Sequence, residues 1–199
     1  MDSFPLFLDR DGTVIVDRHY LSIPADIVLE INAAEGLRAM IALGAIPVII
    51  TNQSGVGRGL FTHTEVNMVH LELDRLLQAE GIIIAGYYSC PHIPEDDCPC
   101  RKPEPGLALQ AAAELGLTLD DAVVVGDKMS DLGLAKAIGA RGILVRTGKG
   151  TECDVAATTQ QFEVADDLLA VSELLIAEEG QRHNVVTGHV QGAGHQARE

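Results

Sequence analysis

The sequence predicts an α/β fold, an open parallel sheet with helices on both faces. Short apolar runs rich in β-branched residues alternate along the chain with longer segments of helical periodicity. Such runs suit strands that are buried on both faces of a parallel sheet, and their alternation with helices is typical of this fold class. Because ligands of these sheets bind at the carboxyl ends of the strands, the residues that follow each run are candidates for a functional site.

Five apolar runs are predicted strands, at residues 5–8, 46–50, 82–89, 122–125 and 142–145. Helices are predicted at 33–44, 64–81, 105–116 and 130–140, and a further one from about Val164 to Glu178. In the segment 64–81, one helical face collects the apolar residues Val66, Val69, Leu73, Leu76 and Leu77. Thr64 is predicted to cap the start of this helix and Gly81 to close its end.

The length of 199 residues fits one globular domain, which we place at residues 1–178. The segment 179–199 has little apolar periodicity and is predicted to be a disordered tail. Its three histidines, His183, His189 and His195, are interpreted as part of a solvated tail rather than as metal ligands. The segment between Thr13 and Thr51 has room for one loop and one helix, so no large cap domain is expected there.

The formal net charge of −15 disfavours non-specific binding to nucleic acid or to an anionic membrane, because the long-range field repels polyanions. No apolar stretch approaches the roughly 20 residues of a membrane span, and Asp2 stands where a secretory signal has basic residues. We therefore expect a cytoplasmic protein that binds neither nucleic acid nor membranes, and we take it to be a monomer.

Polar clusters follow four of the predicted strands. They are DRDGT at 9–13, TNQSG at 51–55, CPHIPEDDCPCRKP at 90–103 and GDKMSD at 126–131. Any one of them could be an ordinary polar loop. The carboxyl ends of parallel strands, however, meet at one edge of the sheet, so the four clusters are expected to lie together.

The carboxylates Asp9, Asp11 and Asp127 of these clusters would repel one another unless a cation lay between them. Mg²⁺ is the natural candidate, because it prefers oxygen ligands and also bridges to a phosphoryl oxygen. Lys102 and the Thr51 hydroxyl would hold the remaining phosphoryl oxygens. Phosphoryl transfer is therefore the chemistry that this set of groups predicts.

Four cysteines are too few for a disulfide scaffold, and three of them lie within residues 90–100. Together with His92, the residues Cys90, Cys98 and Cys100 offer three thiolates and one imidazole, which fit a closed, structural Zn²⁺ site. The pairs are closer than in common zinc motifs, so a group of buried free thiols is the alternative from the residues alone. Cys153 is interpreted as an ordinary free thiol.

The motifs FLDRDGT, TNQSG, CxCRKP and VGDK, in this order, resemble the four signature motifs of the haloacid dehalogenase superfamily. Within it, they are most similar to the D-glycero-D-manno-heptose 1,7-bisphosphate 7-phosphatase family, with the histidinol-phosphate phosphatases as near relatives. The resemblance runs from about Phe4 to Gly150. It implies a Rossmann-like phosphatase without a large cap, acting on the 7-phosphate of a heptose bisphosphate; histidinol phosphate is the alternative substrate. The family also carries a zinc loop before its RKP motif, which favours zinc over free thiols at 90–100.

The resemblance further implies a role for each site residue. Asp9 would be the nucleophile that forms an aspartyl-phosphate, and Asp11 the general acid and base. Mg²⁺ would be held by the side chains of Asp9 and Asp127 and by the backbone carbonyl of Asp11. Thr51 and Lys102 would clamp the phosphoryl group. Substrate contacts would come from Asp17, Tyr20, Asn52, Gln53, Ser54, Arg101 and Lys128.

Some alternatives stay open. Asp131 could orient Lys102 or a metal-bound water, or it could be a carboxylate favoured by a helix N-terminus. The site would also suit a 3′-phosphatase on DNA, which the net charge disfavours. A non-enzymatic phospho-acceptor module is disfavoured by Asp11, because such a module needs no acid or base beside its aspartate. His63 and His70 are predicted to lie on the surface or to cap a helix.

Overall fold

The computed structural model describes the backbone of residues 3–190 and the side chains of residues 3–180. Within this range six parallel strands form one sheet, in the order β3-β2-β1-β4-β5-β6. Their bounds are β1 Phe4–Leu8, β2 Ala45–Asn52, β3 Gly86–Cys90, β4 Val123–Gly126, β5 Arg141–Val145 and β6 Glu163–Ala165. The chain builds outward from β1 in one direction and then from β4 in the other. The carboxyl ends of β1 and β4 therefore flank the point at which such sheets bind ligands.

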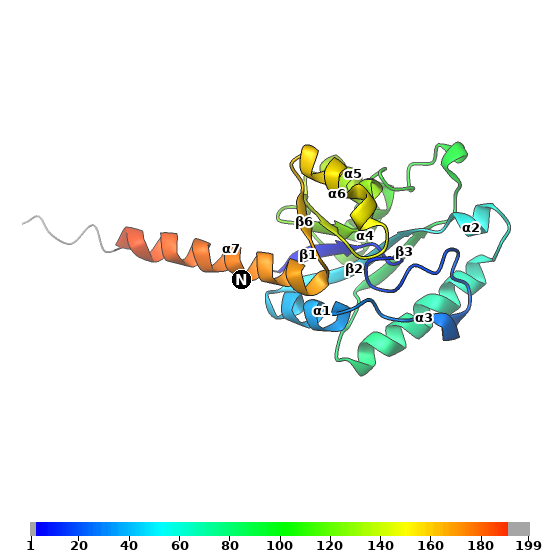
Figure 1. Ribbon diagram of the computed structural model, residues 1–199, viewed down its shortest axis with the longest axis horizontal. Coiled ribbons are helices and arrows are strands. Elements are labelled where there is room, and N and C mark those ends of the chain that lie inside the picture. The colour runs from blue at the N-terminus through cyan, green and yellow to red at the C-terminus, as the bar shows by residue number, and fades with distance from the viewer. Residues whose placement is uncertain (1–2, 191–199) are drawn as a thin grey trace, which may run out of the picture.

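Helices cover both faces of the sheet (Figure 1). One face carries α1 Ala33–Ala42, α3 His63–Ala79 and α7 Leu168–Val190, and the other carries α4 Gly106–Leu115, α5 Met129–Ile138 and α6 Gly150–Thr159. Shorter elements lie in the loops: α2 Ser54–Gly57 and the single-turn 3₁₀ helices Pro24–Asp26 and Pro94–Asp96. The predicted fold class is confirmed.

The alternating side chains of β1 divide the core in two. Leu6 and Leu8 pack with residues of α1, α3 and α7, whereas Phe7 packs with residues of α4 and α5. All three side chains are completely buried. A central strand is covered on both faces, which explains why its sequence is continuously apolar rather than alternating.

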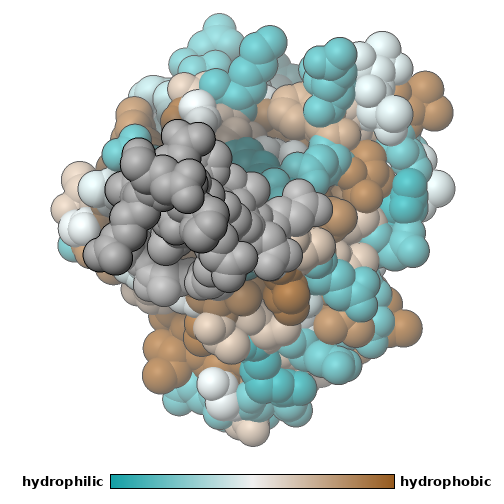
Figure 2. Space-filling model, turned by 90° about the vertical axis from the view of Figure 1, so that its left-hand side faces the viewer, coloured by the Kyte–Doolittle hydropathy of each residue, from teal (hydrophilic) through white to brown (hydrophobic). Residues whose placement is uncertain are grey.

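α7 runs past the sheet on the side where the strands begin, away from the body of the molecule (Figure 1). Figure 2 shows this side, where hydrophilic and hydrophobic side chains are interspersed over the described residues. None of the helices in the described part of the chain has the length and hydrophobicity of a membrane span. The carboxyl ends of the strands lie on the opposite side of the molecule.

The prediction of a third strand at 82–89 is wrong at its start. β3 begins at Gly86, which pairs with Val48 of β2, and the residues before it form a connection. The preceding residue of β2 is Pro47, which accepts a bond from the Ala85 amide but has no N–H to donate in return. The ladder therefore stops there, although the isoleucines at 82–84 resemble a strand in composition.

The limits of α3 also differ from the prediction. Thr62, not Thr64, caps the helix: its hydroxyl accepts from the Glu65 amide at 3.3 Å, and the Glu65 carboxylate accepts from the Thr62 amide at 2.7 Å. Such a capping box satisfies orphan donors in both directions. His70, predicted at the surface or as a cap, is only 8% exposed and stacks on Tyr87.

The carboxyl-terminal region departs most from the predicted elements. Neither β6 nor α6 was predicted. α6 buries only Gly150 and Ala157, so its sequence has almost no apolar periodicity. The predicted helix at 164–178 begins instead at Leu168 and continues to Val190. Residues 191–199 of the predicted tail, and the side chains of its three histidines, lie outside the described residues.

Candidate active site

The four polar clusters come together at the carboxyl edge of the sheet. A cleft of about 280 Å³ lies there, near the lower end of the range for small-molecule sites. The predicted site residues that line it are Asp9, Asp11, Asp17, Tyr20, Thr51, Asn52, Gln53, Ser54, Arg101, Lys102 and Lys128. The lining also includes His19, Leu21, Ser130 and Lys149, to which the sequence analysis assigned no role. Asp127 lies beneath them and is completely buried.

The ammonium group of Lys128 lies where three oxygen atoms converge. Its Nζ atom is 3.3 Å from Oδ2 of Asp9, 3.1 Å from the backbone oxygen of Asp11 and 2.7 Å from Oδ1 of Asp127. These are the three groups that the family resemblance assigns to Mg²⁺. They hold a cation with oxygen atoms alone, which is the donor set that Mg²⁺ prefers. The residues present therefore fit a magnesium ion, and the Lys128 ammonium stands in for it.

Asp131 lies close to the same carboxylates but has other partners. Ligand atoms of Asp9, Asp127 and Asp131 lie within 4.8 Å of one another. Both oxygens of Asp131 are engaged, however: Oδ1 forms an ion pair with Lys102 at 2.7 Å, and Oδ2 accepts from the Lys128 amide at 3.0 Å. Asp131 thus holds Lys102 and also caps α5, so the two roles that the sequence left open coexist.

The ionisation of the buried carboxylates is interdependent. Burial raises the pKa of Asp9, but the charges of Lys102 and Lys128 outweigh this effect and hold that pKa well below its ordinary value. Burial and the Asp9 charge together raise the pKa of Asp127 to about 7. Asp9 is therefore ionised at neutral pH, as a nucleophile must be.

Lys102 and Thr51 lie beside Asp9, in position to contact a phosphoryl group there. Nζ of Lys102 is 2.9 Å from Oδ1 of Asp9, and the side chains of Lys102 and Thr51 are both almost fully buried. Asn52 fixes the backbone of Lys102, because its amide donates to the Lys102 carbonyl at 3.1 Å and accepts from the Lys102 N–H at 3.0 Å. Asn52 therefore has a structural task beyond the substrate contact predicted for it.

Gln53 likewise forms hydrogen bonds with other site residues. Its Nε2 atom donates to Oδ2 of Asp11 at 2.9 Å and to the Thr51 hydroxyl at 2.8 Å. Asp11 also forms an ion pair with Arg10, at 2.9 Å. An arginine between two aspartates carries no pattern of its own, so the sequence did not point to Arg10.

Two glycines allow the backbone to approach Asp127. Gly12 has a φ of +88° and Gly148 a φ of +54°, a left-handed conformation that L side chains rarely adopt. A Cβ atom at either position would lie 2.3 Å from Oδ2 of Asp127. That oxygen instead accepts from the Lys149 amide at 2.8 Å. The loops after β1 and β5 thereby hold Asp127 from both sides.

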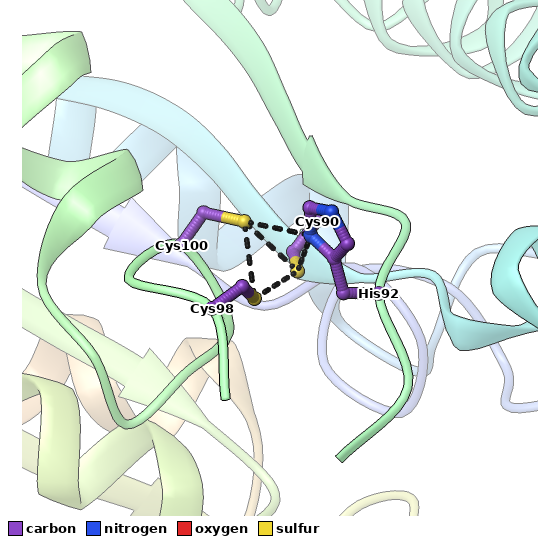
Figure 3. Close-up of side chains that lie close together, drawn as sticks. All are labelled: Cys90, His92, Cys98 and Cys100. Atoms are coloured by element: carbon purple, nitrogen blue, oxygen red, sulfur yellow. Dashed lines mark hydrogen bonds between the residues drawn. The ribbon is translucent and has the colours of Figure 1, made fainter. Parts of the chain in front are cut away.

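Cys90 at the end of β3 and three residues of the loop after it, His92, Cys98 and Cys100, form a compact cluster (Figure 3). Neighbouring Sγ and Nδ1 atoms are 3.1–3.6 Å apart. A tetrahedron with Zn–S bonds of about 2.3 Å has edges only slightly longer than this. All four cysteines of the chain are free, so the cluster is not a disulfide. The donor set and its arrangement fit a closed Zn²⁺ site.

The cluster is connected to the cleft through Arg101. Nη1 of Arg101 donates to the backbone oxygen of His92 at 3.2 Å. Arg101 and Lys102 directly follow Cys100, so the conformation of the cysteine cluster determines where both basic residues leave the loop.

Two basic residues of the cleft have no acidic partner among the described residues. In the described part of the chain, the Arg101 side chain bonds only to the His92 carbonyl, and the Lys149 side chain forms no ion pair or hydrogen bond. Lys102 and Lys128, in contrast, are neutralised by buried carboxylates. Arg58, a further basic residue of the loop after β2, is exposed and is not part of the cleft lining among the described residues.

Comparison with known proteins gives consistent matches. The Hydrolase_like (HAD-hyrolase-like) family model matches residues 99–171. A D-glycero-beta-D-manno-heptose-1,7-bisphosphate 7-phosphatase of Yersinia pestis is 39% identical over 153 residues, covering 72% of this chain and 81% of the relative. The protein of the same name from Pseudomonas aeruginosa is 32% identical, with 86% of this chain and 97% of the relative covered.

A solved structure agrees with these relatives. The D,D-heptose 1,7-bisphosphate phosphatase of B. bronchiseptica, complexed with magnesium and phosphate, superimposes with a TM-score of 0.80 at 32% identity. The match covers 88% of this chain and 99% of that one. The likeness thus extends over most of this chain and nearly all of that one.

Proposed function

Because the chain belongs to the D-glycero-D-manno-heptose-1,7-bisphosphate 7-phosphatase family of HAD-like hydrolases, we propose that it removes the 7-phosphate of D-glycero-D-manno-heptose 1,7-bisphosphate. The chain is a phosphatase of the HAD superfamily. One observation carries the proposed chemistry. Oxygen atoms of Asp9, Asp127 and the Asp11 carbonyl surround one cation, the Lys128 ammonium, next to the ammonium group of Lys102.

In the first step, a carboxylate oxygen of Asp9 bonds to phosphorus while the bond from phosphorus to the sugar oxygen breaks. Asp11 gives its proton to the departing sugar oxygen. In the second step, Asp11 takes a proton from water as the water oxygen attacks phosphorus, and the bond to Asp9 breaks. Inorganic phosphate and free Asp9 result, so the enzyme returns to its starting state.

The side chains of Asp9 and Asp127 and the carbonyl of Asp11 would hold Mg²⁺. The ion would neutralise charge on the phosphoryl oxygens and on the carboxylates. Lys128 would leave its present position on binding of the ion, because two cations cannot share the same three oxygens. Thr51 and Lys102 would contact the remaining phosphoryl oxygens, and the Lys102 ammonium stays charged because Asp131 and Asp9 raise its pKa against the effect of burial.

We also propose that Cys90, His92, Cys98 and Cys100 bind a structural Zn²⁺. The surrounding loop has few core residues of its own, and a closed metal site would hold it in one conformation. The proposed thiolate ligands must stay reduced, which agrees with the cytoplasmic location that we also propose.

The charges of the cleft favour a substrate with a second phosphate. Arg101 and Lys149 lack acidic partners in the described structure, and a second anionic group would provide one. Histidinol phosphate carries an amine that would instead prefer acidic neighbours. The acidic residues of the zinc loop, Glu95, Asp96 and Asp97, are not part of the cleft lining among the described residues.

The test is phosphate release from heptose 1,7-bisphosphate, histidinol phosphate and a 3′-phosphorylated oligonucleotide, with Asp9→Asn as the inactive control. We expect the heptose bisphosphate to give the highest kcat/KM, and magnesium removal to abolish turnover. A higher kcat/KM for histidinol phosphate would contradict the substrate. Stable phosphorylation of Asp9 without release from any substrate would identify a phospho-acceptor module instead.

A further inference from the structure

Arg10 is the largest side chain that the fold buries completely. It lies between the proposed nucleophile Asp9 and the proposed acid and base Asp11, yet it forms no part of the cleft lining in the described structure. Its guanidinium faces the Asp11 carboxylate as a fork: Nε is 3.0 Å from Oδ2, and Nη2 is 3.2 Å from Oδ1. A fully buried guanidinium cannot contact a substrate in the cleft, but it does contact a residue that can.

The surroundings of Arg10 leave Asp11 as its counter-charge. Among the described residues, Asp11 is the only carboxylate within ion-pair distance of Arg10. Burial and the charge of Arg10 lower the pKa of His70 to about 3, so the His70 ring is neutral and offers Arg10 no counter-charge. His70 stacks on Tyr87, and the Tyr87 hydroxyl bonds to Asp74 at 3.3 Å. The Asp74 carboxylate of α3 thus bonds to Tyr87 and forms no ion pair with Arg10.

The Asp11 carboxylate is held by Arg10, which lies outside the cleft lining among the described residues, and by Gln53, which is part of it. The Oδ2 atom of Asp11 accepts from Arg10 and, at 2.9 Å, from Gln53. Its side chain is nevertheless 17% exposed and lines the cleft. Arg10 thus bonds to both oxygens of a carboxylate that also reaches the cleft.

We propose that Arg10 is a positioning residue that holds the Asp11 carboxylate in the orientation required for proton transfer. The inference rests on the proposed function, in which Asp11 protonates the leaving oxygen. A planar fork suits this task, because two parallel N–H bonds define the plane of a carboxylate, whereas a lysine ammonium would hold it at a single point. Burying an unpaired guanidinium is costly, so removal of either partner disturbs the other.

The dependence on the leaving group separates positioning from a merely structural role. A sugar alkoxide needs a proton to depart, whereas p-nitrophenolate is a far weaker base and departs without one. For kcat/KM, which reports the first irreversible step, Arg10→Met should lower the value for the sugar phosphate by about 100-fold or more. The value for p-nitrophenyl phosphate should fall only a few fold, so the ratio of the two values changes.

The matched control is Leu73→Ala, which removes a buried side chain from the adjoining core without touching Asp11. It should lower thermal stability but reduce kcat/KM for both substrates alike. Arg10→Lys, which retains the charge in nearly the same volume, should show an intermediate change in the ratio. If Arg10→Met is too unstable to isolate, Arg10→Lys decides: an unchanged ratio in that variant overturns the inference.

A double variant tests whether Arg10 acts through Asp11. If it does, Arg10→Met adds no further loss of kcat/KM for the sugar phosphate once Asp11 is Asn. Multiplication of the two separate losses would overturn the inference and leave a structural role. Full activity of Asp11→Asn alone would contradict the proposed function itself, so the two failures are distinguishable.

Discussion

The ammonium group of Lys102 forms an ion pair with Asp131 at 2.7 Å, although one residue follows β3 and the other lies in the first turn of α5. Both side chains are almost fully buried, and a second ion pair joins Lys102 to Asp9 at 2.9 Å. Lys102 is therefore held beside Asp9, the proposed nucleophile, by carboxylates from two different segments, before any phosphoryl group arrives.

Asp131→Asn should weaken both activity and stability. Lys102 would keep only one carboxylate partner, and we expect the free energy of unfolding to fall by about 2–3 kcal/mol. A misplaced Lys102 should lower kcat by roughly 10- to 100-fold. Urea unfolding and steady-state kinetics measure the two effects. Asp166→Asn, which removes an exposed partner of Arg146, is the control and should change neither. Unchanged kcat in Asp131→Asn would show that this ion pair does not position Lys102.

Gly12→Ala should be far more damaging than Gly59→Ala. Both glycines have positive φ angles, +88° and +70°, so both alanines carry backbone strain of about 1–2 kcal/mol. Only at Gly12 would the new Cβ meet the Asp127 carboxylate, since nothing lies within 4 Å of that position at Gly59. We expect Gly12→Ala to abolish phosphate release and Gly59→Ala to retain it. Equal activities in the two variants would contradict a requirement for close approach to Asp127.

Cys98→Ser should release zinc and loosen the loop that presents Arg101. Zinc content by mass spectrometry should fall well below that of the wild type, because a serine hydroxyl is a poor ligand compared with a thiolate. KM should rise, since Arg101 bonds to the backbone of His92 in the same loop. Cys153→Ser, outside the cluster, should leave the zinc content unchanged. Full zinc content in Cys98→Ser would remove Cys98 from the ligand set.

His70 makes the free energy of unfolding depend on pH in the acidic range. Its pKa is about 3 in the folded protein and 6.5 in a free side chain, so between these values the unfolded chain binds a proton that the folded chain does not. Stability therefore falls as the pH is lowered below about 6.5, and by roughly 2 kcal/mol between pH 7 and pH 5.

His70→Phe should remove this contribution while keeping the stack on Tyr87. The wild type is expected to lose about 2 kcal/mol more than the variant over the same pH interval in urea unfolding. Protonation of other groups, the cysteine cluster included, is common to both proteins and cancels in the difference. The same loss in both proteins would mean that His70 is protonated in the folded state.

The chemistry of the site could be predicted from the sequence because its signals are local. Asp9 and Asp11 follow the first predicted strand directly, and Arg101 and Lys102 lie in the polar segment after the third; the carboxyl ends of parallel strands share one edge of a sheet. The cysteine pattern is equally local. The resemblance to known motifs then assigned roles that spacing alone left open.

The contacts between distant segments were decided by the tertiary structure. The ammonium of Lys128 lies among three oxygens from two strands, Lys149 reaches the cleft from the loop after β5, and Arg10 turns inward toward α3. No local pattern specifies which way a polar side chain turns at the end of a strand. That direction follows from which buried charge is nearest once the sheet has assembled, because an unpaired charge inside a protein is too costly to remain.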